Sequence, residues 1–178
     1  FEGRVRIGRG ARVYDSTVRN YLLGDESLVE RVTALECRRR SAFGNGTEVA
    51  AMNECAGRTV RIYDALTAQI AYLLAVYRHR PQTIAALERM IGAYVLERTS
   101  ELGSVGRGAC VKGARFVREV RIGDGATIDG ATLLENGTLC AGAFVGADVK
   151  ARDFILAEGA RVDNLSPYTH LTLPTILR

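Results

Sequence analysis

Three consecutive basic residues, Arg78, His79 and Arg80, precede a proline near the middle of the chain. Guanidinium and imidazolium groups are strong hydrogen-bond donors to phosphate oxygens, so this triplet is a candidate anion site. Histidine also titrates near neutral pH, which makes His79 a candidate general base. The alternative is that these side chains are solvated at an exposed turn and bind no ligand.

A second set of polar residues lies where a repeated apolar pattern stops. Glu36 ends one stretch of that pattern, and Asn53, Glu54 and Arg58 follow another. Carboxylate and amide oxygens together can bind a sugar hydroxyl or a metal-bound phosphate, so these four residues are candidate ligand-binding residues. The alternative is structural, because a chain that leaves a regular stack has backbone groups at its exit that need hydrogen-bond partners.

Other motifs are less informative. The basic run Arg38–Arg40 suits either a solvated loop or contact with a phosphate-bearing ligand or an acidic partner. The chain has no glycine-rich phosphate loop, and its histidines provide no Ser/His/Asp triad. We expect no metal site, because no Cys-x-x-Cys pair occurs among Cys37, Cys55, Cys110 and Cys140, which we expect to be free thiols.

Apolar residues at helical spacing occupy the region from residue 58 to residue 102. One set contains Ile70, Leu73, Leu74 and Tyr77, and a second contains Ile84, Leu87, Ile91 and Val95. Asp64 is a suitable N-cap for the first helix, and Pro81 suits the first turn of the second. The short connector predicts an antiparallel helical hairpin with Arg78–Arg80 at its tip. We expect three tyrosines at the interface where the apolar faces of the helices are covered: Tyr72, Tyr77 and Tyr94.

A five-residue unit repeats outside this helical region. It consists of an apolar residue, glycine in most copies, two turn-forming residues, and a small or β-branched residue, and its copies begin at Ile7, Leu23, Phe43, Val105, Ile122, Val145 and Leu156. A further apolar residue follows most copies at a six-residue spacing, which fits neither a helix nor a simple alternating strand. The pattern indicates short strands between tight corners. Three such sides make one turn of a parallel β-helix, whose turns stack on one another.

These units are similar to the hexapeptide repeat of left-handed β-helix proteins, which include acyltransferases and the β-helical parts of sugar-nucleotide pyrophosphorylases. A narrower resemblance is to a family of long bacterial hexapeptide-repeat proteins of unknown function. It lies in the segments 41–46, 53–54, 62–64, 68–72, 77–81 and 134–137. The predicted fold is therefore mainly β, a left-handed parallel β-helix interrupted by an antiparallel α-helical hairpin.

The resemblance implies a transferase-like protein linked to sugar or sugar-nucleotide metabolism, with catalytic parts beyond this chain. An enzyme of this kind would be an acyltransferase or a sugar-nucleotide transferase that uses acyl-CoA or a nucleotide sugar. Such acyltransferases use a histidine as general base, a role that His79 would have here. The resemblance also implies a homotrimer. The alternative is a non-catalytic β-helical scaffold or assembly module whose helices dock a partner.

Composition excludes several classes of protein. The chain is 47% hydrophobic and 25% charged, as expected of a folded globular protein. Its net charge is +4, but the basic residues are spread along the chain, so we expect no nucleic-acid partner. No apolar run reaches the roughly 18 residues of a membrane span. We therefore expect no membrane partner. The free thiols favour a cytoplasmic protein, and the basic triplet favours a small phosphate-bearing ligand.

The predicted organisation has four parts. Residues 3–57 and 103–165 form β-helix turns, residues 58–102 form the inserted hairpin, and residues 166–178 depart from the repeat pattern. Within the last part, Tyr168–Thr175 resembles a translated sequencing adapter, so we expect this segment to lie outside the fold. Because the first residue is not methionine, we also expect residues to be missing at the N-terminus.

Overall fold

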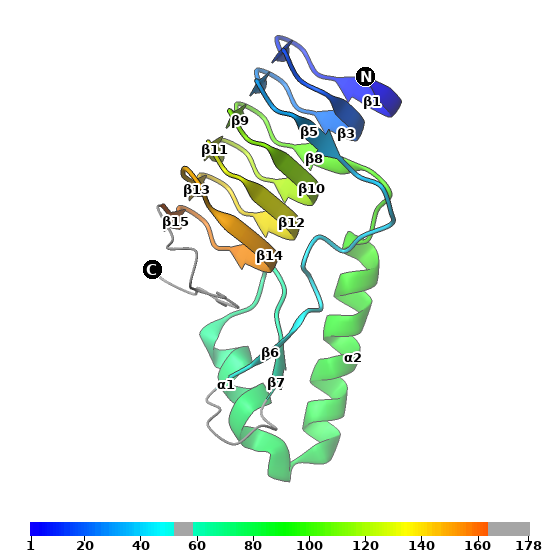
Figure 1. The fold of residues 1–178 in the computed structure, drawn as a ribbon. Helices are drawn as coiled ribbons and strands as arrows, with labels where there is room; N and C mark the ends of the chain where they lie inside the picture. Colours follow the sequence, from blue (N-terminus) through cyan, green and yellow to red (C-terminus); the bar gives the residue numbers. More distant parts are fainter. Residues whose placement is uncertain (52–58, 164–178) are drawn as a thin grey trace.

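The structure, a computed structural model, describes residues 1–51 and 59–163. Most of its strands belong to two parallel sheets, between which the chain alternates as it advances (Figure 1). The first sheet contains β1 (Glu2–Ile7), β3 (Val18–Leu23), β5 (Ala34–Glu36), β8 (Gly103–Val105), β10 (Phe116–Ile122), β12 (Leu133–Leu139) and β14 (Lys150–Leu156). The second contains β2 (Arg12–Tyr14), β4 (Leu28–Glu30), β9 (Cys110–Lys112), β11 (Thr127–Asp129), β13 (Phe144–Val145) and β15 (Arg161–Val162). The prediction of a mainly β protein is confirmed.

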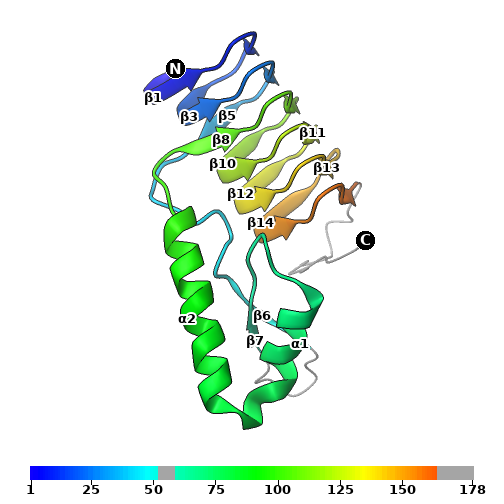
Figure 2. The ribbon, with the colours of Figure 1, turned by 180° about the vertical axis from the view of Figure 1, so that it is seen from behind.

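Each circuit of the chain lies beside the previous one, and together the circuits form what we call the stack (Figure 1, Figure 2). Ile128, for example, pairs in parallel with Val111 of the preceding circuit and with Val145 of the next. Residues that meet in neighbouring circuits are typically 16 or 17 positions apart in the sequence. This regular offset explains why the sequence repeats itself.

The chain changes direction three times per circuit at residues with positive φ, and these residues stack into three columns. The columns contain Gly3, Asn20, Glu119, Asn136 and Asp153; Gly10, Glu26, Gly108, Gly125, Gly142 and Gly159; and Asp15, Arg31, Gly113, Gly130 and Asp148. Positive φ is costly for most L-residues, whereas glycine adopts it freely and asparagine and aspartate adopt it at lower cost. The turn-forming residues of the repeat therefore mark corners of the circuit.

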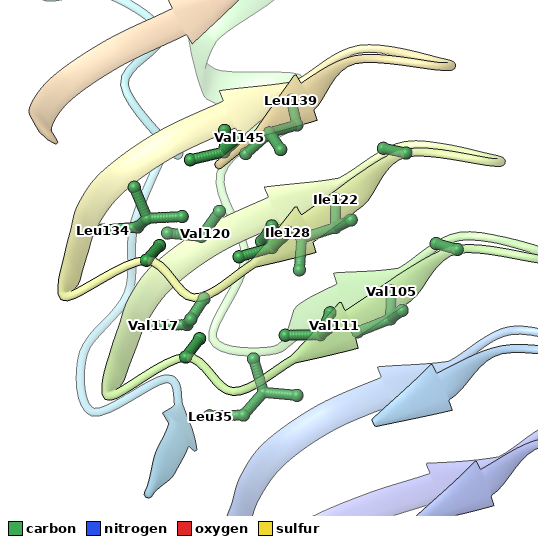
Figure 3. Close-up of a cluster of buried hydrophobic side chains, with 14 of the residues drawn as sticks. Leu35, Val105, Val111, Val117, Val120, Ile122, Ile128, Leu134, Leu139 and Val145 are labelled. Atoms are coloured by element: carbon green, nitrogen blue, oxygen red, sulfur yellow. The ribbon is translucent and has the colours of Figure 1, made fainter. Parts of the chain in front are cut away.

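Apolar side chains fill the inside of the stack in columns that follow the strand register (Figure 3). Nine of them are at most 2% exposed: Leu35, Val117 and Leu134; Val105, Ile122 and Leu139; and Val111, Ile128 and Val145. Burying each such side chain stabilises the fold by about 1.5–3 kcal/mol. The repeated apolar positions of the sequence are thus the core positions of the stack.

Two copies of the repeat lie elsewhere than the pattern indicates. The column that contains Gly123 continues with Cys140, whose N–H donates to Leu156 O at 2.9 Å, and Val145 lies in the second sheet instead. Phe43 lies outside both parallel sheets. The pattern misplaces these copies because an apolar residue followed by glycine and turn-forming residues suits more than one corner of the circuit.

Residues 37–102, which we call the arm, leave the stack between β5 and β8. Strand β3 pairs with β5 near its start and with β8 near its end, so β5 and β8 together fill the place of one strand. The described part of the arm contains an antiparallel pair, β6 (Glu48–Ala50) and β7 (Thr59–Arg61), then α1 (Ala68–Val76), the 3-10 turn η1 (Tyr77–His79) and α2 (Pro81–Arg98). Figure 2 shows both helices extending away from the stack.

The helices of the arm enclose a small apolar core of their own with β7, formed by Val60, Tyr63, Leu74, Ala75 and Ile91. Pro81 is the first residue of α2, as predicted. The predicted cap at Asp64 is wrong, because Thr67 Oγ1 accepts the N–H of Ile70 at 3.3 Å and so caps α1.

Candidate functional site

Glu36 lies at the end of β5 and is only 6% exposed. Its Oε1 accepts a hydrogen bond from Arg118 Nε at 2.8 Å and pairs with Arg38 Nη2 at 2.7 Å. Burial raises the pKa of this carboxyl, but the hydrogen bonds and charges of the two arginines outweigh burial, so the pKa lies below its ordinary value. Glu36 is therefore an ionised group whose contacts are made within the protein.

Glu36 also belongs to a row of alternating charges across the first sheet, which we call the charge ladder. The strand register places its members side by side in the order Glu2, Arg19, Glu36, Arg118, Glu135 and Arg152. Three of the neighbouring pairs form ion pairs: Glu2 with Arg19 at 3.8 Å, Glu36 with Arg118 at 2.8 Å, and Glu135 with Arg152 at 3.1 Å. Opposite charges side by side favour this register, whereas like charges would disfavour it. The ladder continues across the exit of the arm, because Glu36 and Arg118 are neighbours.

The basic run Arg38–Arg40 lies near the start of the arm. The backbone N–H of Arg38 donates to Glu119 Oε1 at 2.9 Å, and Cys37 Sγ donates to Arg39 O at 3.2 Å. Burial, followed by the negative charge of Glu119, raises the pKa of the Cys37 thiol to about 11. The thiol is therefore protonated at neutral pH. The bond from Arg38 to Glu119 ties the exit of the arm to the stack.

The next residues of the arm dock on a corner of the stack, which we call the seam. Asn136 Oδ1 accepts hydrogen bonds from Ser41 Oγ at 2.9 Å and from the N–H of Gly44 at 3.1 Å. Thr138 Oγ1 donates to the carbonyl of Phe43 at 2.6 Å. Phe43 itself is 3% exposed and belongs to the core of the stack. The seam therefore joins the arm to β12 by both polar and apolar contacts.

A polar network continues from the seam into α2. Asn45 Oδ1 accepts the N–H of Asp64 at 2.8 Å, and the hydroxyl of Tyr94 donates to Asp64 Oδ1 and accepts from Arg98 Nη2. Burial raises the pKa of Tyr94, as does the bond to Asp64, while Arg98 opposes them. Sequence reasoning missed this network because its members are far apart in the chain. The one signal was the expected position of Tyr94 at the covered interface of the helices.

The triplet Arg78–Arg80 lies at the far end of the arm, in η1 and at the start of α2, and all three side chains are exposed. Arg78 Nη2 donates to Thr59 O at 3.0 Å. The ring of Tyr77 lies 5.4 Å from that of His79 and 6.1 Å from that of Tyr72, measured between centroids. Tyr72 and Tyr77 thus lie at the tip, away from the polar network that contains Tyr94.

A groove with a volume of about 420 Å³ lies beside this tip. Its lining residues come from β7, α1, η1 and α2, and they are Thr59, Leu74, Arg78, Pro81, Ile84, Ala85 and Glu88. Glu88 pairs with Arg61 Nη1 at 3.3 Å. The groove therefore combines an apolar floor with one cation, Arg78, at its wall.

Of the other predicted site residues, Asn53, Glu54 and Arg58 lie outside the described residues. Glu36 is buried within the stack, whereas Arg78, His79 and Arg80 lie together at the tip. Within residues 1–51 and 59–163, no group of three His, Cys, Asp or Glu side chains is arranged to hold a metal ion. Of the predicted site residues, Arg78, His79 and Arg80 are therefore the ones that the structure places together, at an exposed tip with aromatic rings and a groove beside it.

Among the described residues, no helix combines the length and the apolar character needed to cross a bilayer. An uncharacterized protein of Treponema pallidum (strain Nichols) is 22% identical in an alignment of 160 residues that covers 82% of this chain and 22% of that protein. The chain thus spans less than a quarter of that relative's length. No solved structure matches the chain. A family model described as "Domain of unknown function (DUF4954)" matches residues 6–171, nearly the whole chain, and the chain belongs to that family.

Proposed function

We propose that the stack is a left-handed parallel β-helix of the hexapeptide-repeat class, interrupted by an antiparallel helical hairpin in the arm. Three observations support this proposal: circuits of 16 or 17 residues, three columns of positive φ, and apolar positions that stack in register. Resemblance to that class also supports a homotrimer and a cytoplasmic location. Sedimentation equilibrium tests the trimer, and a monomer at all concentrations would contradict it.

We infer that this part of the protein acts as a non-catalytic scaffold, in which the stack holds the arm in a fixed position. The observation that carries the inference is the seam, where Asn136 and Thr138 bind the backbone and side chains of the arm. The polar network through Asp64 and Tyr94 then connects the seam to α2. Glu36, the buried carboxylate at the exit of the arm, binds two arginines of the protein itself.

An assay of group transfer tests the scaffold. The chain is incubated with acyl-CoA or a nucleotide sugar and a mixture of amine and sugar acceptors, and released CoA or nucleoside diphosphate is measured by mass spectrometry. We expect no release above the buffer control. Release that disappears in a His79→Ala variant of unchanged thermal stability would contradict the scaffold and would identify His79 as the general base.

A transferase-like role in sugar or sugar-nucleotide metabolism is the second proposal. The groove beside Arg78 supports it, because its size suits a small ligand. In this case acyl-CoA or a nucleotide sugar binds here, and the catalytic groups lie elsewhere in a longer protein. The same transfer assay on a full-length family member separates the two roles: turnover by the longer protein supports a transferase, and its absence with both donor classes contradicts it.

A further inference from the structure

The tip of the arm exposes an aromatic surface beside its positive charges. We define the tip patch as Tyr72, Tyr77, Arg78, His79 and Arg80. Tyr72 is 58% exposed and Tyr77 is 38% exposed, although both rings are large and partly apolar. The rings of Tyr77 and His79 are inclined by 32°, so they form an uneven shelf of aromatic surface. Clustered exposed rings of this kind are typical of binding surfaces.

The positive charge of the tip patch is not neutralised within the described residues. No ion pair there joins Arg78, His79 or Arg80 to a carboxylate. The bond from Arg78 to Thr59 O uses one of five guanidinium N–H donors. The first turn of α2 contains no acidic residue. A phosphate group would supply the missing negative charge and accept several charge-assisted hydrogen bonds.

The groove extends the tip patch with apolar surface. Leu74, Pro81, Ile84 and Ala85 line it, and Arg78 belongs both to the groove and to the tip patch. Glu88 is the acidic residue of the groove, and its pairing with Arg61 reduces its repulsion of an anion. A volume of about 420 Å³ lies within the range of small-molecule sites. The groove and the rings therefore favour a ligand that has a flat or apolar part next to its anionic part.

We propose that the tip patch binds a nucleoside phosphate, with its phosphate on Arg78 and Arg80 and its base against Tyr72, the more exposed of the two tyrosine rings. Inorganic phosphate would use the cations but leave the rings in water. Stacking of a base on an aromatic side chain is worth about 1–3 kcal/mol, so the rings add affinity that phosphate alone cannot gain. An extended nucleic acid would need a longer basic track than these three residues provide.

Isothermal titration calorimetry on the full chain tests the proposal with four probes: uridine diphosphate, adenosine diphosphate, inorganic phosphate and uridine. The variants are the double substitution Arg78→Gln/Arg80→Gln and the single substitution Tyr72→Ala. The matched control is Arg89→Gln, which removes an exposed arginine of α2 that bonds to a carbonyl of its own helix. Thermal unfolding of each variant verifies that the arm is folded.

We expect at least one diphosphate to bind about tenfold more tightly than phosphate or uridine. The double arginine variant should weaken this binding about tenfold, Tyr72→Ala should weaken it several-fold, and Arg89→Gln should leave it unchanged. Equal affinity for diphosphate and inorganic phosphate, or binding unaffected by the arginine substitutions, would overturn the proposal. So would binding to anionic lipid vesicles without binding to either nucleotide. The scaffold role can fail separately, because it is tested by group transfer and not by affinity.

Discussion

The hydroxyl of Tyr21 forms hydrogen bonds to a part of β10 that has no strand on one side, at the place where the arm interrupts the first sheet. Tyr21 is fully buried, and its hydroxyl donates to Val120 O at 2.8 Å and accepts the N–H of Val120 at 3.2 Å. The residues of β10 on either side pair with β5 and with β8, whereas Val120 falls between those two strands. A side chain two circuits away therefore satisfies a backbone that has lost its neighbour.

Replacing Tyr21 with Phe removes the hydroxyl and keeps the ring. The N–H and the carbonyl of Val120 then lose their partner inside a core from which water is excluded. An unsatisfied buried polar group costs about 1–3 kcal/mol, and Phe no longer carries a hydroxyl that must be desolvated, so we expect a net loss of about 2–4 kcal/mol. This is a large part of the stability of a typical domain.

Urea unfolding at neutral pH measures this loss, provided that the slope of the unfolding free energy against urea concentration is the same in both proteins. The matched control is Tyr14→Phe, because Tyr14 is 53% exposed and its hydroxyl should contribute less than about 0.5 kcal/mol. A loss below about 0.5 kcal/mol in Tyr21→Phe would show that Val120 finds another partner and would refute the reasoning. Gly103→Ala tests the ring itself, because an added Cβ would lie 2.2 Å from Tyr21 Cζ.

Three other substitutions test separate parts of the structure. The folded pKa of Glu36 lies below its ordinary value of 4.5, so its ion pairs stabilise the fold above that pH and are lost as the pH falls through the lowered pKa. Glu36→Gln should therefore lessen the fall of the urea midpoint on acidification, and an unchanged fall would contradict this. Asn136→Ala should raise hydrogen exchange of residues 41–45 about tenfold while the strands stay protected; equal exchange would exclude Asn136 as the anchor. Gly106→Ala would place a Cβ 2.5 Å from Asp124 N, so it should cost about 1–3 kcal/mol by chemical unfolding, and unchanged stability would rule out the close approach.

The stack could be predicted from the sequence because the same local rules operate in every circuit. Apolar residues such as Ile122 and Ile128 are buried, and a corner such as Gly125 has positive φ. The copies at Phe43 and Val145 were misplaced because the same local chemistry suits several corners. Which corner a copy occupies depends on the circuits above and below it, and the local pattern does not contain that information.

The seam could not be predicted, because its hydrogen bonds join residues that are 92 to 95 positions apart. In the sequence, Asn136 is an ordinary turn residue, and nothing marks it as the acceptor for Ser41. The tip was easier to predict, because Arg78, His79 and Arg80 are adjacent in the chain and share one turn. The aromatic residues of the tip were predicted less accurately, since Tyr72 was expected at a covered interface and is exposed.

The position of the arm leaves most of the strand pairing of the stack intact. The arm interrupts a strand at the corner that Asn20 and Glu119 mark in the neighbouring circuits, so the two halves of that strand, β5 and β8, keep their pairing on both sides. The charge ladder is not interrupted, because Glu36 still meets Arg118. Val120 pairs with Gly137 of β12 but has no partner in β5 or β8, and on that side Tyr21 satisfies both of its backbone groups. An insertion away from a corner would instead break several ladder bonds and expose the core, so a corner within a strand is where a stack of this kind can carry an arm at the lowest cost in stability.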